Sequence, residues 1–384
     1  LAAPEPQIHA TADLVETPTA PTDRTSASQT RLRERPNLPV ITRTRAIVAF
    51  VALAVIATLV VLLVVRPQQA PTQTASNSAT EATTPSTSAE ITPSESPTTS
   101  PPLALPQSAT PLADSVIVWP RVRNGNWDIA TIDIKTDKEE RVTTNGEEDT
   151  VPVISPDRRT IIYSRRGPDG GLRVIGADGT GDRRLFPQHP AGCGNIPRPA
   201  WHETTLAIIC ESTAAPGASI LSLVSLDGTV IRELDHGTMG DPAFTPDGTA
   251  VVYWKSTESG TGLFSMAADG QSEPIRLTDA RNGADADPVV SPDGKQLAFR
   301  RQTSGPRVIM TMPFDGRRVT GDPKAQTKGQ NDQDPSWSPD GKSIAYKHGP
   351  DNDADLWVLD LKSGKTTRVV DNSEPDTAPA WTTR

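Results

Sequence analysis

The sequence predicts an all-β fold, a six-bladed β-propeller, and three observations support this fold class. A phrase of the form Asp-Pro-x-x-Ser/Thr-Pro-Asp-Gly recurs at 241–253, 287–300 and 334–347, with diverged copies at 151–163 and 198–209. The prolines that open these phrases follow one another at intervals of 43 to 47 residues, a period typical of propeller blades. Apolar residues come in runs of four or five without the 3.6-residue spacing of helices. The opening prolines are Pro152, Pro199, Pro242, Pro288, Pro335 and Pro379.

Each repeat is expected to supply four strands. Two apolar strands flank the Pro-Asp-Gly turn, in which proline presets the first φ and glycine takes a positive φ. A third strand, as at 263–266 or 356–359, is followed by a tight turn such as Asp269-Gly270, which suits a two-residue hairpin. The fourth strand, as at 275–278, is more polar, and this polarity suits an outer edge.

The two ends of the repeat region predict how the ring closes. Residues 116–143 contain three strands without an opening phrase, whereas residues 378–381 form an opening phrase with no strands after it. We therefore expect the C-terminal strand to complete the N-terminal blade. One shared blade and five complete ones give a count of six, and the closed ring leaves few exposed sheet edges.

The N-terminal part predicts a membrane anchor. Residues 1–45 are rich in Pro, Thr, Ala and Arg and are expected to form a disordered cytoplasmic tail. Residues 46–65 are twenty uncharged, mainly apolar residues, enough for a transmembrane helix of roughly 30 Å. A cleaved signal peptide is the alternative, but its apolar core is normally shorter. Arginines between 31 and 45 predict a cytoplasmic N-terminus and an extracytoplasmic propeller on a single-pass protein of the cell membrane.

The remaining boundaries follow from composition. Residues 66–111 are dominated by Pro, Ser and Thr and are expected to form an extracytoplasmic stalk, and residues 112–384 to form the propeller. The chain begins at Leu1, so the sequence leaves open whether it is a fragment with a further domain upstream.

The repeats resemble a known family. The opening phrase, together with Leu-Trp-Val-Leu-Asp at 356–360 and Arg-Leu-Thr at 276–278, resembles the TolB-like (WD40-like) propeller family over about residues 114–384. This resemblance implies a six-bladed propeller outside the cytoplasmic membrane. The family's periplasmic namesake carries an additional α/β domain that binds envelope partners. A predicted anchor and stalk stand in its place here, so that translocation role is not carried over.

Catalytic motifs are absent from the sequence. It contains no Gly-x-Ser-x-Gly, His-Glu-x-x-His or phosphate-binding loop, so no enzyme activity, cofactor or metal is predicted for these residues. Cys193 and Cys210 are candidates for a disulfide, which an oxidising compartment favours. Separate thiols, or a zinc site with His189 and His202, are the alternatives.

The candidate binding site is the mouth of the central tunnel. Opening strands are innermost in a propeller, so the residue before each opening proline is expected near the axis. A cation or a basic peptide tip could bind there, because three of these residues are carboxylates and one is an arginine. In the alternative, each Asp only accepts hydrogen bonds from neighbouring backbone. The six residues are Val151, Arg198, Asp241, Asp287, Asp334 and Ala378.

Aromatic residues also recur on the opening strands. They are Trp201, Phe244, Trp337 and Trp381, and we expect them to pack between blades rather than to form a ligand cage.

These features predict a membrane-anchored extracytoplasmic propeller that acts as a scaffold or sensor. Its partner would be an envelope protein, peptide or glycan bound by a propeller face, and no nucleic-acid partner is predicted. One alternative is the C-terminal sensor portion of a receptor-type serine/threonine kinase, with the catalytic domain upstream of Leu1. The layout of tail, span, stalk and propeller resembles such receptors. A second alternative is a metal-dependent propeller enzyme. The sequence does not specify the ligand, the binding face or the oligomeric state.

Overall fold

The computed structural model describes residues 104–384, apart from 169, 280, 282, 371–374 and 382–384. The chain divides into two units, 1–94 and 95–384, and the described residues belong to the second. The predicted tail (1–45), the predicted transmembrane helix (46–65) and most of the predicted stalk lie outside them. Within the described part, no helix is both long enough and apolar enough to cross a membrane.

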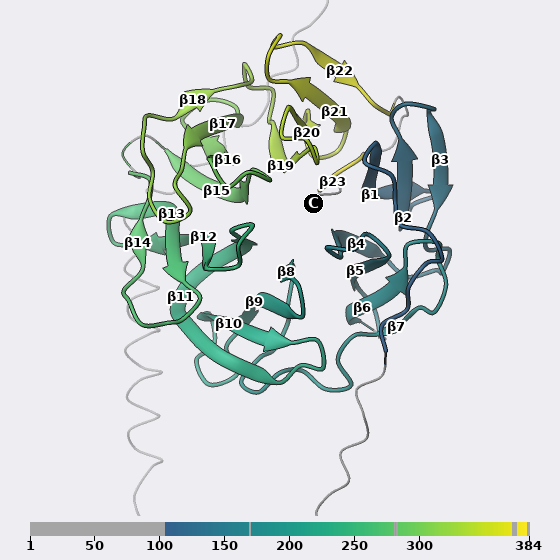
Figure 1. The fold of residues 1–384 in the computed structure, drawn as a ribbon, viewed down its shortest axis with the longest axis horizontal. Coiled ribbons are helices and arrows are strands. Elements are labelled where there is room, and N and C mark those ends of the chain that lie inside the picture. The colour runs from purple at the N-terminus through teal and green to yellow at the C-terminus, as the bar shows by residue number, and fades with distance from the viewer. Residues whose placement is uncertain (1–103, 169, 280, 282, 371–374, 382–384) are drawn as a thin grey trace, which may run out of the picture. The chain divides into compact units, whose positions relative to one another are not determined.

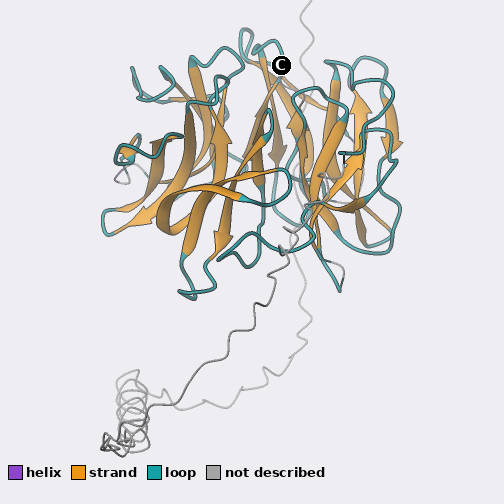
Figure 2. Cartoon of the chain, turned by 60° about the horizontal axis from the view of Figure 1, so that its bottom comes forward, coloured by secondary structure: helices purple, strands orange, loops and turns teal. Residues whose placement is uncertain are grey.

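The described residues form an all-β propeller, in which antiparallel sheets stand around a central axis (Figure 1). Within each sheet the strands follow one another from the axis outwards, and loops join the sheets at both faces (Figure 2). The four-stranded sheets, written from the innermost strand outwards, are β23 (Ala380–Trp381), β1 (Val116–Arg123), β2 (Asn126–Asp133) and β3 (Lys138–Arg141); β4 (Asp149–Ile154), β5 (Thr160–Arg165), β6 (Gly171–Gly176) and β7 (Arg183–Arg184); β15 (Ala284–Val290), β16 (Gln296–Gln302), β17 (Val308–Pro313) and β18 (Lys324–Ala325); and β19 (Gln333–Trp337), β20 (Ser343–His348), β21 (Asp355–Asp360) and β22 (Thr366–Arg368).

A seven-stranded sheet completes the ring. Its strands are β8 (Pro199–His202), β9 (Thr205–Glu211), β10 (Ser219–Ser225), β11 (Val230–Phe244), β12 (Ala250–Thr257), β13 (Gly260–Ala267) and β14 (Ile275–Arg276). The long strand β11 joins its two halves, because residues 230–237 pair with β10 and residues 238–244 pair with β12. The sequence predicts a loop between two separate blades here. The structure instead has one continuous strand, which runs from an outer to an inner position (Figure 1).

The C-terminal strand closes the ring as predicted. In β23, Trp381 pairs with Ile117 and Ala380 pairs with Val118 of β1. The Trp381 indole N–H donates to the Asp114 carbonyl at 2.9 Å, and the Trp381 backbone N–H donates to the Ser336 hydroxyl of the preceding sheet at 2.9 Å. The last strand of the chain therefore completes the sheet that the first strands begin.

The predicted Ser/Thr-Pro-Asp-Gly turns form and show why the phrase recurs. At the β15–β16 hairpin, the Ser291 hydroxyl donates to the Asp293 carboxylate at 2.7 Å, and the Gly294 N–H donates to the Ser291 carbonyl at 2.8 Å. Gly294 has a φ of 73°, which favours glycine. Equivalent hydroxyl-to-carboxylate bonds occur from Thr245 and Ser338 at 2.7 Å. Each turn thus satisfies its own polar groups locally.

The apolar core lies between neighbouring sheets rather than within one of them. Val118 and Ile129 of the first sheet, for example, pack against Ile161 and Tyr163 of the next, and all four are fully buried. Such packing orients each sheet toward the axis and fixes which residues of its inner strand reach the tunnel.

The boundary of the predicted stalk requires a correction. Residues 104–111 were assigned to it, yet the structure places them against the β4–β5 hairpin. The Ser108 N–H donates to the Arg159 carbonyl at 3.0 Å, and the Thr160 hydroxyl donates to the Pro106 carbonyl at 2.7 Å. Leu105 packs against the core beside β6. Composition did not indicate this docking, because it uses mainly backbone groups, which every residue type carries.

Candidate binding site at the tunnel mouth

The inner strands carry an unusual backbone conformation at the positions predicted to face the tunnel. Val151, Asp241, Asp287, Asp334 and Ala378 have positive φ angles of 54°, 52°, 53°, 53° and 41°. The strand register shifts at the first four of them, so each lies in a β-bulge. A positive φ costs a residue with a side chain about 1–2 kcal/mol. The same cost is borne in successive sheets, and the bulge aims these side chains at the axis.

The structure brings the four predicted charged residues together. The Arg198 guanidinium lies 3.6 Å from the Asp334 carboxylate. Asp287 also approaches this pair, because its carboxylate accepts the Asp334 backbone N–H at 3.4 Å. Electrostatic coupling links Asp241 to all three, as its pKa shows.

Two further residues complete the cluster, and both lie on the second strand of a sheet. Arg300 of β16 donates from Nε to Asp287 at 2.7 Å. Trp254 of β12 donates from its indole N–H to Asp241 at 2.8 Å. The sequence analysis did not identify them. They occupy equivalent positions, opposite Ala286 and Gly240, and this place in the repeat is the signal that would have found them.

Burial and mutual repulsion raise the acidity constants of this cluster. Burial raises the pKa of Asp241 to about 6, and the charges of Asp287 and Asp334 add to this effect while Arg198 opposes it. Burial and the Asp287 charge also raise the pKa of Asp334. Burial acts to lower the pKa of Arg198, but Asp334 and the other carboxylates outweigh it and raise that pKa. Arg198 therefore stays charged.

The alternative interpretation of these aspartates, as acceptors for backbone N–H groups, does not describe the contacts well. Asp241 and Asp287 take their short hydrogen bonds from the side chains of Trp254 and Arg300. One long backbone contact, from the Asp334 N–H to Asp287, crosses between sheets. The carboxylates thus belong to a network of side chains at the axis.

A cavity of about 420 Å³ opens beside this network. It lies between the β9–β10 hairpin and the strands β11 and β12. Arg198, Asp241, Trp254, Met239 and Glu211 contribute to its walls. Both charge signs and an aromatic surface therefore border one space that is large enough for a side chain.

A second cavity of about 280 Å³ lies at the opposite ends of the inner strands. Trp201 and Phe244 line it together with His202, whose ring centroid is 5.5 Å from that of Phe244. Trp337 and Trp381 are buried between sheets as predicted, with 2% and 6% exposure. For Trp201 and Phe244 the expectation of blade packing is incomplete, because these half-buried side chains also border a cavity.

Four buried aspartates behind the mouth were missed by the sequence analysis. They lie two residues before the axial position and are no more than 1% exposed: Asp149, Asp285, Asp332 and Asp376. Their partners on the neighbouring strand differ. Asp285 forms two bonds with Arg301, at 2.7 and 2.8 Å, whereas Asp332 contacts His348 at 2.7 Å. The repeated spacing Asp-x-x-Pro is the sequence signal that would have found them.

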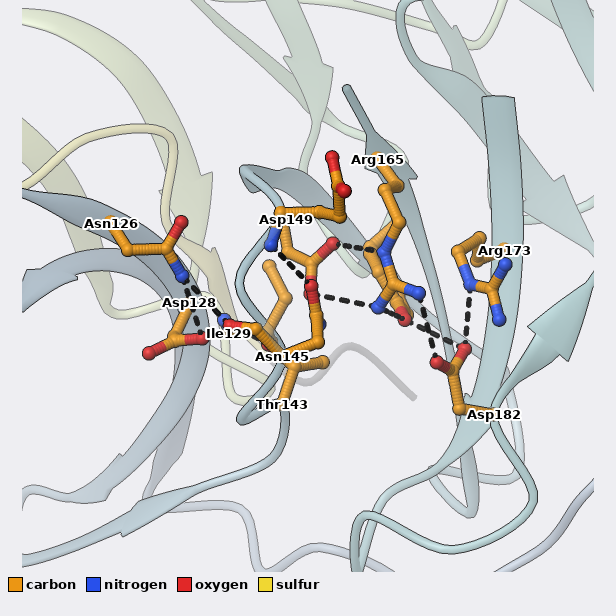
Figure 3. A network of polar contacts seen from close by, with 11 residues as sticks. Asn126, Asp128, Ile129, Thr143, Asn145, Asp149, Arg165, Arg173 and Asp182 are labelled. Atoms are coloured by element: carbon orange, nitrogen blue, oxygen red, sulfur yellow. Dashed lines mark hydrogen bonds and ion pairs between the residues drawn. The ribbon is translucent and has the colours of Figure 1, made fainter. Parts of the chain in front are cut away.

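The network around Asp149 shows what these aspartates do (Figure 3). Its carboxylate accepts two bonds from Arg165, at 2.7 and 3.0 Å, and a third from Asn145 at 2.6 Å. Arg165 also approaches Asp182 at 3.2 Å, and Asp182 pairs with Arg173 at 2.8 Å. The network ties the loop that enters the inner strand to the next two strands, so it supports the mouth rather than forming it.

The two cysteines form a disulfide. Cys193 and Cys210 are bonded with a Cα–Cα distance of 5.4 Å. It joins the loop before β8 to strand β9, next to the larger cavity. The bond leaves no thiol for the zinc site considered with His189 and His202. Among the described residues, no group of three or more His, Cys, Asp or Glu side chains is arranged to hold a metal ion.

The fold and the mouth together define a β-propeller with a charged tunnel opening. Residues 216–382 match the family described as TolB beta propeller domain. No curated protein matches the chain. The propeller is thus TolB-like, in agreement with the resemblance of its repeats.

Solved structures show the same fold at low sequence identity. TolB from Acinetobacter baumannii has a TM-score of 0.59 at 16% identity and aligns over 70% of this chain and 67% of its own. A putative TolB from Agrobacterium tumefaciens has a TM-score of 0.54 at 20% identity, over 68% of this chain and 90% of its own. A nidogen/laminin complex has a TM-score of 0.55 at 11% identity, over 69% of this chain and 97% of its own. At these identities the likeness concerns the fold alone.

Proposed function

We propose that this chain is a membrane-anchored, extracytoplasmic propeller that binds an envelope protein, peptide or glycan at the tunnel mouth. The predicted span at 46–65 and the arginines before it support the anchoring and the orientation. TolB-like propellers are in general protein-binding, which supports a recognition role. We count six blades in this proposal, since β11 serves as the outer strand of one four-stranded unit and the inner strand of the next.

The observation that carries the proposal is the charged mouth itself. Three carboxylates and two guanidinium groups converge there on backbone that adopts a strained conformation in successive sheets. Strain of this kind clusters at ligand-binding sites, where the surrounding structure maintains it. The adjoining cavity gives a ligand access to the charges.

Photo-crosslinking in intact cells tests this proposal with the full chain. A photoreactive residue replaces Glu211, which is exposed and lines the cavity, or Gln271, which is exposed on a turn at the outer edge. We expect a discrete adduct with an envelope component from position 211 and none from position 271. Digestion of the adduct with protease or glycosidase assigns the partner class. Equal adducts from both positions, or none from 211, would contradict binding at the mouth.

A further inference from the structure

The three axial carboxylates differ in the residue that faces them from the second strand of the same sheet. Arg300 lies 2.7 Å from Asp287. Lys347 occupies the equivalent position for Asp334, and its charge favours the ionised form of that carboxyl group. Facing Asp241, however, is the neutral Trp254. In the part of the chain that the structure describes, Asp241 is thus the axial carboxylate without a basic residue at this position.

The charges nearest to Asp241 do not supply the missing cation. Arg198 lies closer to Asp334, with which it forms an ion pair at 3.6 Å. The described residues place no lysine, arginine or histidine within ion-pair distance of Asp241, and Trp254 occupies only one of its two oxygens, Oδ2. A carboxylate that is largely buried and surrounded by like charges is costly to ionise, and a bound cation would remove that cost.

The cavity lies directly in front of this carboxylate. Its volume of about 420 Å³ falls within the range of small-ligand pockets, roughly 300–1,000 Å³. Met239 and the Trp254 ring give it apolar walls, and Glu211 adds a second carboxylate at the rim.

Gly240 keeps the Trp254 ring in place. A Cβ atom at position 240 would lie 2.7 Å from the indole nitrogen, so the ring can lie against the backbone because residue 240 is glycine. This contact holds one face of the indole and fixes its N–H toward Asp241. The ring is thus a rigid wall of the cavity.

We infer that this cavity is a specific subsite for a lysine or arginine side chain of a bound peptide. The cationic group pairs with Asp241, and the methylene groups lie along Trp254 and Met239. An aromatic ring beside a carboxylate suits such a group, since the ring attracts cations and the methylenes need an apolar surface. The inference rests on the proposed function and narrows its ligand to a basic peptide. An anionic group fits less well, because Arg198 already pairs with Asp334.

Short peptides test the subsite directly. The probes are acetyl-Gly-Lys-Gly-amide, its arginine counterpart and a norleucine counterpart of similar length without the charge. Binding to the full chain, purified in detergent, is measured by saturation-transfer NMR and titration at pH 7.5 and physiological salt. We expect the lysine and arginine peptides to bind at least about tenfold more tightly than the norleucine peptide.

Matched variants locate the binding. Asp241→Asn keeps the size of the side chain and suits a positive φ, so the fold is retained. It is expected to weaken binding of the basic peptides about tenfold or more. Glu258→Gln removes the same charge from an exposed turn between β12 and β13 and is expected to change binding less than about twofold.

The outcomes separate the inference from the proposed function. Equal losses in Asp241→Asn and Glu258→Gln, or equal binding of the norleucine peptide, would overturn the subsite. If crosslinking from position 211 persists in that case, the mouth binds another class of ligand, and the proposed function stands without the subsite. If crosslinking fails as well, the proposed function fails too.

Discussion

At the scale of single residues, the mouth combines a costly backbone with a costly charge. Asp241 adopts a φ of 52° and is surrounded by Asp287 and Asp334, with one indole N–H as its short hydrogen-bond partner. A residue selected only for stability would not be ionised in this position. The arrangement is understandable if Asp241 serves binding, because binding sites commonly retain locally unfavourable residues.

Replacement of Asp241 tests this cost through the pH dependence of stability. Its pKa is raised from an ordinary 3.8 to about 6, so the folded protein holds the proton at pH values where the unfolded chain has lost it. Wild-type stability should therefore fall as the pH rises from about 4 to about 6. Asp241→Asn removes this term and should be roughly 2 kcal/mol more stable at pH 7.5, allowing for partial solvent screening.

Denaturant unfolding of both proteins between pH 4 and 8 measures the effect. The stability difference should disappear near pH 4, where the aspartate is protonated in both states. A constant difference across this range would show that Asp241 does not titrate as described.

At the scale of the strand pair, buried ion pairs hold the inner strand to its neighbour. Asp285 of β15 and Arg301 of β16 are opposite each other in the register and form a bidentate pair with 0% and 9% side-chain exposure. The pair lies at the mouth end of the strands, two residues before the bulge at Asp287. It opposes the local loss of strand pairing that the bulge causes.

Removing one partner of this pair should be severely destabilising. Asp285→Ala leaves the Arg301 guanidinium buried without its carboxylate, and we expect a loss of about 3–5 kcal/mol in the free energy of unfolding. Asp279→Ala is the control, because its partner Arg281 is 88% exposed, and this pair should contribute less than about 1 kcal/mol. Urea unfolding measures both variants. Similar losses in the two would show that burial does not set the strength of the pair.

At the scale of the whole molecule, the ring depends on a short terminal strand. β23 has two residues, yet Trp381 is 6% exposed and contacts both the first sheet and the sheet before it. Asp376 extends this attachment, since it accepts a hydrogen bond from Trp119 at 3.0 Å. The closing contacts therefore involve few residues but cover the edge of β1, which would otherwise be exposed.

Truncation tests the importance of closure. Deletion of residues 378–384 removes β23 and should lower the free energy of unfolding by at least about 3 kcal/mol, the cost of losing one buried aromatic side chain. Deletion of 382–384 alone is the control and should have little effect. Circular dichroism melting compares the three proteins. A melting temperature unchanged by the longer deletion would show that the ring holds together without its closing strand.

The sequence by itself determined the features that depend on local chemistry repeated along the chain. The Pro-Asp-Gly turns, the period of 43 to 47 residues and the closing strand at Trp381 were predictable, because each requires particular residues at fixed positions. The same holds for the convergence of Arg198, Asp241, Asp287 and Asp334, since symmetry brings equivalent positions of a ring to one axis.

Only the tertiary structure decided which groups those residues meet. The sequence could not show that Asp241 faces Trp254 whereas Asp287 faces Arg300, because the choice depends on register between strands. It also could not show that β11 continues from one unit into the next, or that residues 104–111 dock on the β4–β5 hairpin. These features rest on backbone pairing and packing between segments, which local composition does not specify.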